Sequence, residues 1–84
     1  MLDQSQLNDL ADTILQIKTR HEMIEFLHAI LTRKELEEIP RRLQIVKKLK
    51  KGIPQHTIAQ NLGVGVATVT RGANEIKKGR FQNI

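Results

Sequence analysis

The sequence predicts an all-α protein of about five short helices, and three observations support this. Apolar residues recur at intervals of three and four, whereas no stretch alternates with the period of two that marks a half-buried strand. Two segments have the residue pattern of a helix start, and a glycine-rich turn separates two further helical stretches. The 84 residues suit one domain, but a chain of this size buries only roughly 60–65% of its unfolded surface, so its core is marginal.

The first expected helix has Leu7, Leu10, Ile14 and Ile17 on a single stripe. A second helix follows Thr19, whose hydroxyl can accept the amide of Glu22 while that glutamate reaches back, as in a capping box. It extends to about Leu31 and has a wide apolar surface made of Met23, Ile24, Phe26, Leu27, Ile30 and Leu31. Such a surface is wider than one stripe and needs cover on more than one side.

The third expected helix begins after Thr32, which with Glu35 repeats the capping-box spacing. Its predicted buried stripe is Leu36, Ile39, Leu43, Val46 and Leu49. Pro40 has no amide and crowds the preceding turn, so we expect a kink or a restart near Ile39. The closing lysines suit the helix dipole and could equally contact phosphates; they are Lys47, Lys48, Lys50 and Lys51. Gly52 can close this helix.

A short fourth helix and a fifth helix flank the glycine turn. Pro54 can occupy the first turn of the fourth helix, which would direct Ile58 and Leu62 inward. Gly63 can end that helix with positive φ, Val64 can return to the core, and Gly65 can cap the fifth helix. The expected inward residues of the fifth helix are Val66, Val69 and Ile76. This arrangement predicts a helix-turn-helix, in which the second helix enters the DNA major groove; the general alternative is two packed helices.

The charge is distributed unevenly along the chain. Residues 1–31 have a net charge of −3, and the remainder has +8, which together give +5. A basic half indicates a polyanionic partner, with nucleic acid first and a membrane surface second, although a solvated basic face is also common. Polar donors on the expected outward face of the fifth helix favour DNA, and small apolar groups beside them can meet thymine methyls. The predicted DNA-binding residues are Gln55, His56, Val66, Ala67, Thr68, Thr70, Arg71 and Asn74.

Several classes of site find no support in the sequence. The three histidines lie far apart and lack partners at metal-ligand spacings. Ser5 is the only serine, cysteine is absent, and no phosphate-binding loop follows a strand, so we expect no enzyme. The lack of cysteine fits a reducing compartment, and no apolar run approaches the roughly 20 residues of a membrane span, so the expected location is the cytoplasm, at the nucleoid.

The segments LTRKELEEIPRRLQIVKKLKKG and IAQNLGVGVATVTRGANEIK resemble the bacterial tryptophan repressor family, with ATVTRGAN the most specific part. The resemblance is good from about Leu31 to Lys77. It implies an intertwined helical homodimer that represses transcription at a palindromic double-stranded DNA operator. It also implies L-tryptophan, or a related aromatic amino acid, as corepressor, with no metal or covalent cofactor. The expected division is 1–51 for dimerisation, 52–78 for DNA binding and 79–84 as a tail.

The resemblance also implies a corepressor site. Its expected residues are Leu31, Thr32, Arg42, Arg71, Gly72 and Glu75. Arg42 and Arg71 would hold the indole between them, because a guanidinium plane can stack on an aromatic face while offering donors to a carboxylate. The alternative is that Arg42 pairs with Glu38 one turn earlier, and that Arg71 contacts only phosphate.

Three features depart from the family pattern. The segment from Gly52 to Gly63 is one residue shorter, which affects the approach of Gln55 and His56. Glu75 replaces a serine, and its carboxylate could bind the ligand ammonium or repel the ligand carboxylate. The sequence stops at GRFQNI without a further helix, so Phe81 is either a loose cover or disordered. Competing interpretations are a ligand-independent regulator, a targeting module of a recombinase or transposase, and a small helical interaction module.

Overall fold

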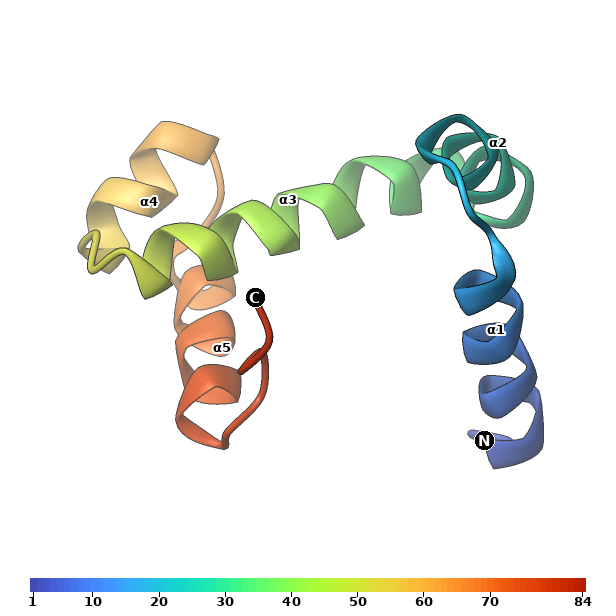
Figure 1. Ribbon diagram of the computed structural model, residues 1–84. Helices are drawn as coiled ribbons and strands as arrows, with labels where there is room; N and C mark the ends of the chain where they lie inside the picture. Colours follow the sequence, from blue (N-terminus) through green and yellow to red (C-terminus); the bar gives the residue numbers. More distant parts are fainter. The chain divides into compact units, whose positions relative to one another are not determined.

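Five α-helices and no strand make up the computed structural model, which describes residues 1–84. The helices, labelled in Figure 1, are α1 (Gln4–Gln16), α2 (Arg20–Ile30), α3 (Arg33–Lys50), α4 (Gln55–Leu62) and α5 (Val66–Lys77). The all-α prediction is therefore confirmed. The chain divides into two compact units, Met1–Leu36 and Glu37–Ile84, and the boundary falls within α3. The predicted functional division at residues 51 and 52 stays a prediction.

Side-chain caps begin the helices of the first unit. The carboxylate of Asp3 accepts hydrogen bonds from the Ser5 hydroxyl at 2.7 Å and from the Gln6 amide at 3.2 Å. These bonds lower the pKa of Asp3, and the bond from the Ser5 hydroxyl has the largest effect. Thr19 accepts the amide of Glu22 at 3.1 Å, but the expected return bond from this glutamate is not formed. The Thr19 capping box is thus only half complete.

The second capping box is complete. The Thr32 amide donates to the Glu35 carboxylate at 2.8 Å, while the Glu35 amide donates to the Thr32 hydroxyl at 3.2 Å. The bond from the Thr32 amide lowers the pKa of the Glu35 carboxyl, because it stabilises the ionised form. Two amides at the start of α3 that have no partner within the helix are satisfied in this way.

No side chain in α1 or α2 is buried. Leu15, Ile24 and Ile30 are among the exposed apolar residues, and Leu7 and Leu10 of the predicted stripe are exposed as well. The wide apolar surface that the sequence predicts for the second helix is therefore only partly covered in the single chain: Ile24 and Ile30 are exposed, and its other members are half-buried.

The second unit has its own core. Ile45 from α3, Ile58 from α4 and Val69 from α5 are each 2% exposed or less, and the buried Ala59 completes the cluster. Four half-buried apolar residues pack against it: Leu49, Ile53, Leu62 and Val64. Each helix of this unit thus contributes one fully buried aliphatic side chain, which fixes α4 and α5 against the C-terminal part of α3.

Two expectations about α3 are wrong in part. The helix does not restart near Ile39, since Pro40 lies inside one α-helix of 18 residues; the alternative, a kink at this point, stays a prediction. The predicted stripe is buried only in part: Val46 is buried and Leu36 and Leu49 are half-buried, as expected. Ile39 and Leu43, however, are 42% and 39% exposed, and the unpredicted Ile45 is buried. The reason is that α4 and α5 cover the side of α3 that carries Ile45 and Leu49, so burial follows this packing rather than the longest apolar repeat.

The turn between α4 and α5 matches its prediction closely. Gly63 adopts the left-handed conformation with φ of 65°, and the Val64 amide donates back to the Ala59 carbonyl at 3.0 Å, as in a Schellman motif. Gly65 is the N-cap of α5. Pro54 differs slightly from expectation, because it is the N-cap of α4 and not part of its first turn. Gly52 also has positive φ, as expected.

One inward assignment in α5 is also wrong. Val69 is buried and Ile76 is half-buried, but Val66 is 51% exposed. The reason is its position: Val66 is the first residue of α5, and the neighbouring helices do not cover it there. The structure contains no helix with the length and apolar character that a bilayer span requires.

Candidate nucleic-acid interface and adjoining cavity

The helix α5 presents three different faces. At 3.6 residues per turn, Val69 and Ile76 point into the core, whereas Ala67 and Asn74 point roughly the opposite way and are exposed. Thr68 and Glu75 define a third face, about 90° from the second. Arg71 lies on the border between the last two faces and is exposed. The helix that the sequence predicts to enter the DNA groove therefore also forms one wall of a cavity.

Most of the predicted DNA-binding residues are exposed on or beside the face of α5 that carries Ala67 and Asn74, called here the outward face. The exposed members are Ala67 and Asn74 on this face, Thr68 and Arg71 towards the cavity, Val66 at the start of α5 and His56 at the start of α4. A helix face with hydroxyl, amide and guanidinium donors beside a small methyl group can meet phosphates and base edges.

Gln55 and Thr70 have a direct contact with each other. The Thr70 hydroxyl donates to Oε1 of Gln55 at 2.7 Å, and both side chains are partly buried. This hydrogen bond joins the first turn of α4 to the middle of α5. Both residues are predicted to bind DNA, and the structure places them side by side at the edge of the outward face.

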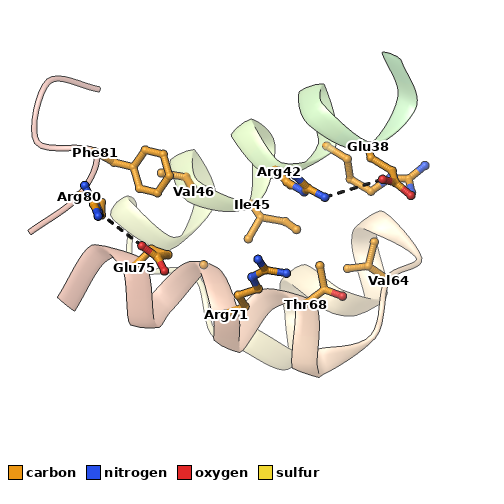
Figure 2. Close-up of a pocket in the computed structure, with 12 residues that line it drawn as sticks. Glu38, Arg42, Ile45, Val46, Val64, Thr68, Arg71, Glu75, Arg80 and Phe81 are labelled. Atoms are coloured by element: carbon orange, nitrogen blue, oxygen red, sulfur yellow. Dashed lines mark ion pairs between the residues drawn. The ribbon is translucent and has the colours of Figure 1, made fainter. Parts of the chain in front are cut away.

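A cavity of about 700 Å³ lies between α3, α5 and the residues that follow α5. Apolar side chains and charged side chains of both signs line it. The lining residues are Glu38, Arg41, Arg42, Ile45, Val46, Val64, Thr68, Arg71, Gly72, Glu75, Arg80 and Phe81. Figure 2 shows Arg71 pointing from α5 towards α3, with Glu38 and Val64 at one end of the cavity and Arg80 and Phe81 at the other. Its size is within the range of about 300–1,000 Å³ that is usual for small-molecule sites.

Four of the predicted corepressor residues line this cavity: Arg42, Arg71, Gly72 and Glu75. The other two, Leu31 and Thr32, are the C-cap of α2 and the N-terminal cap of α3, and they are not among its lining residues. The structure thus brings together the residues of α3 and α5 that the family resemblance selected.

The ion pairs around the cavity are loose and exposed. Arg42 Nη2 lies 3.7 Å from Glu38 Oε2, which is the contact that the alternative interpretation predicted. Glu75 lies 3.5 Å from Lys78 Nζ and 3.6 Å from Arg80 Nε. Because exposed pairs of this kind contribute at most about 1 kcal/mol, both arginine–glutamate contacts can exchange for contacts with a charged ligand.

Gly72 explains how α5 comes so close to α3. A Cβ atom at this position would lie 3.2 Å from Cγ2 of Ile45 and 3.4 Å from Cδ1 of Leu49. The absence of a side chain therefore permits the approach that forms the floor of the cavity.

Sequence reasoning missed several lining residues. Arg41 lies one turn before Ile45, which is buried but outside the predicted stripe. Thr68 was predicted only for DNA, although it also faces the cavity. Arg80 was not predicted, because a turn after α5 and not a helix determines where it lies. For Phe81, the sequence left a loose cover and disorder open, and its place in the cavity lining favours the cover.

Comparison with known proteins identifies one family. The family model described as Trp repressor protein matches residues 5–83. The chain is 42% identical over 76 residues to the Trp operon repressor homolog of Vibrio vulnificus (strain YJ016), covering 89% of this chain and 72% of that protein. It is 50% identical over 54 residues to the Trp operon repressor homolog of Haemophilus influenzae (strain PittEE), covering 63% of this chain and 54% of that protein. No solved structure gives a significant match.

Proposed function

Because the chain belongs to the Trp repressor family, we propose that it is a DNA-binding transcriptional repressor that responds to L-tryptophan or a related aromatic amino acid. It would act as a homodimer at a palindromic operator, at the nucleoid in the cytoplasm. The observation that carries the proposal is the position of the cavity, whose α5 wall adjoins the exposed face predicted to enter DNA. Neither a recombinase-targeting module nor a protein-interaction module is favoured by a specific observation.

The cavity has the chemistry that a zwitterionic aromatic ligand requires. Ile45, Val46 and Val64 supply apolar surface for a ring, Arg42 and Arg71 can stack on it or bind a carboxylate, and Glu75 can accept from an ammonium. We expect the ligand carboxylate to replace the loose contact between Arg42 and Glu38.

Ligand binding would act on DNA binding through α5. Thr68, Arg71, Gly72 and Glu75 line the cavity from this one helix, so an occupant would change the orientations that α5 can adopt against α3. The effect on DNA affinity cannot exceed the difference in ligand affinity between those orientations.

The uncovered N-terminal helices support the homodimer. Residues 1–36 contain no buried side chain, and pairing of the same surface on two copies would cover the apolar residues of α1 and α2. In this proposal residues 1–51 dimerise and residues 52–78 bind DNA. A two-fold pair of α5 helices would then read half-sites about one DNA turn, or about 34 Å, apart.

Calorimetric titration of L-tryptophan, with and without operator duplex, tests the ligand role. Arg71→Ala should weaken both ligand and DNA binding, because Arg71 borders both faces of α5. Asn74→Ala is the matched control, since Asn74 is exposed on the outward face and does not line the cavity; it should reduce only DNA binding. Unchanged ligand affinity in the Arg71 variant would exclude this cavity as the corepressor site.

The salt dependence of binding tests the DNA role separately. The logarithm of the association constant should fall linearly with the logarithm of salt concentration, by about 0.9 for each phosphate neutralised. The arginine and lysine side chains give residues 32–84 a net charge of +8, so a flat dependence would contradict a cationic interface.

A further inference from the structure

After α5 the chain reverses and runs back alongside this helix (Figure 1). Residues of this returning segment line the cavity. Gly79 has φ of 90°, and the Arg80 amide donates to the Glu75 carbonyl at 3.1 Å, which ends the helix and reverses the chain. Arg80 and Phe81 then line the cavity beside Val46 and Glu75. The helix repeat cannot place these side chains, so this turn alone brings them to the site.

Lys50, the last residue of α3, anchors the returning segment. Its ammonium group donates to the carbonyl of Phe81 and, at 2.7 Å, to the carbonyl of Ile84. Arg80 adds a side-chain contact, with Nε 3.6 Å from Oε2 of Glu75. The segment is thus attached to both helices that form the cavity, and hydrogen bonds from a charged donor are the stronger kind.

Phe81 has an unusual backbone conformation. It is the one non-glycine residue with positive φ, at 62°, and residues with a Cβ atom avoid this region unless their surroundings hold them there. The bond from Lys50 to the Phe81 carbonyl supplies such a restraint. The result is an aromatic ring at the cavity that is still 38% exposed and offers apolar surface to an occupant.

We propose that residues 79–84 form a lid on the cavity, latched by Lys50, and that Phe81 and Arg80 are part of the ligand site. The proposal rests on the function proposed above for its ligand, an aromatic amino acid. Phe81 adds an aromatic wall opposite α5, while the loose pair of Arg80 and Glu75 places a cationic donor and a carboxylate at the edge of the cavity, where each can exchange the other for a charged group of the ligand. Since the ligand contacts the lid only when the lid is docked, ligand binding and lid docking favour each other equally.

The first experiment measures docking without any ligand. The chain contains no tryptophan and no tyrosine, so Phe81→Trp introduces a single fluorophore in the lid. Adding Lys50→Met should raise its acrylamide quenching constant by about two- to threefold, because residue 81 passes from the 38% exposure of Phe81 in the docked segment to full exposure. Lys51→Met is the matched control, since it removes the same charge from a neighbouring lysine that makes no bond to the segment, and it should leave quenching unchanged.

A quenching constant equal to that of the urea-unfolded chain would overturn the docked lid. The same conclusion would follow if Lys50→Met had no more effect than Lys51→Met. Neither outcome depends on which ligand the cavity binds.

The second experiment measures ligand affinity by calorimetry with L-tryptophan. Phe81→Ala and Lys50→Met should each weaken binding by about three- to tenfold, as expected for losing an aromatic contact. Asn83→Ala, in the same segment but outside the cavity lining, should bind as the wild type does. If the wild type binds and Phe81→Ala binds equally well, the lid has no role in the site while the proposed function stands. If the wild type does not bind L-tryptophan, the proposed corepressor and the ligand role of the lid both fail, and quenching alone decides whether the segment docks.

Discussion

The two units of the chain treat their apolar residues in opposite ways. Glu37–Ile84 buries Ile45, Ile58 and Val69 almost completely, whereas Met1–Leu36 buries no side chain and leaves Ile24 and Ile30 exposed. Isolated helices of 13 and 11 residues, the lengths of α1 and α2, are marginal in water. The C-terminal unit can therefore fold around its own core, while the N-terminal unit needs a second surface to cover it.

The largest effect is expected from substitutions that prevent a second surface from covering α1 and α2. Replacing Ile24 and Ile30 with glutamate should yield a monomer with much of the helix content of α1 and α2 lost. Symmetric pairing would bury these charges on both copies, at a cost of about 4 kcal/mol or more per dimer. Sedimentation velocity and circular dichroism measure the two effects, with Gln16→Glu as an exposed control. A wild type that is monomeric and fully helical at high concentration would remove the contrast between the units.

The next effect tests the independent core of the C-terminal unit. Ile58→Ala should lower the free energy of unfolding by about 3 kcal/mol, because Ile58 is fully buried and its truncation leaves a cavity. Val66→Ala in the same unit should change this free energy by less than about 0.5 kcal/mol, since Val66 is exposed at the start of α5. Urea denaturation gives both values, and equal losses would mean that the two sites are packed alike.

A smaller effect on stability is expected at the turn between α4 and α5 in the C-terminal unit. Gly63→Ala should destabilise the protein by about 1 kcal/mol, because an L-residue is strained at φ of 65°. At Gly65, where φ is −71°, alanine meets no neighbouring atom within 4 Å. There the loss of a favoured N-cap residue and the reduced entropy of the unfolded chain should nearly cancel. Thermal unfolding of the two variants should separate them, and a Gly63 variant as stable as the Gly65 variant would argue against the left-handed turn.

The smallest effect belongs to the capping box of the N-terminal unit. Hydrogen bonds from Thr32 lower the pKa of Glu35 in the folded state, so this carboxylate stabilises the fold at pH values above its usual pKa of 4.5. That contribution is lost as the pH falls from this value through the lower pKa of the folded state. Stability measured from pH 6 to pH 3 should fall less in Glu35→Gln than in the wild type. Identical profiles would show that the cap has no pH-dependent role.

Local patterns were sufficient to predict the five helices, the Thr32 cap and the Gly63 turn, because each depends on a few neighbouring residues. The buried face of α3 could be predicted only in part: Val46 and Leu49 were expected, but Ile45 was not, since its burial depends on where α4 and α5 pack. The continuity of α3 through Pro40 is also not a local property.

The candidate site shows the same division between local and long-range information. Arg42, Arg71 and Gly72 followed from resemblance to the family, and the structure brings them and Glu75 around one cavity. Arg80 was missed, and Phe81 was expected only as a loose cover or as disordered, because the positions of both depend on a chain reversal and on the distant Lys50.

The hydrogen bond between Thr70 and Gln55 has a consequence for how a base would be read. Because Oε1 of Gln55 accepts the Thr70 hydroxyl, this bond directs the amide oxygen towards α5 and leaves the NH₂ group to donate elsewhere. We therefore expect Gln55 to meet hydrogen-bond acceptors in the groove, such as N7 of a purine or O4 of thymine, and to discriminate against the donor of cytosine. Since this rotamer is set before DNA arrives, little side-chain freedom remains to be lost on binding.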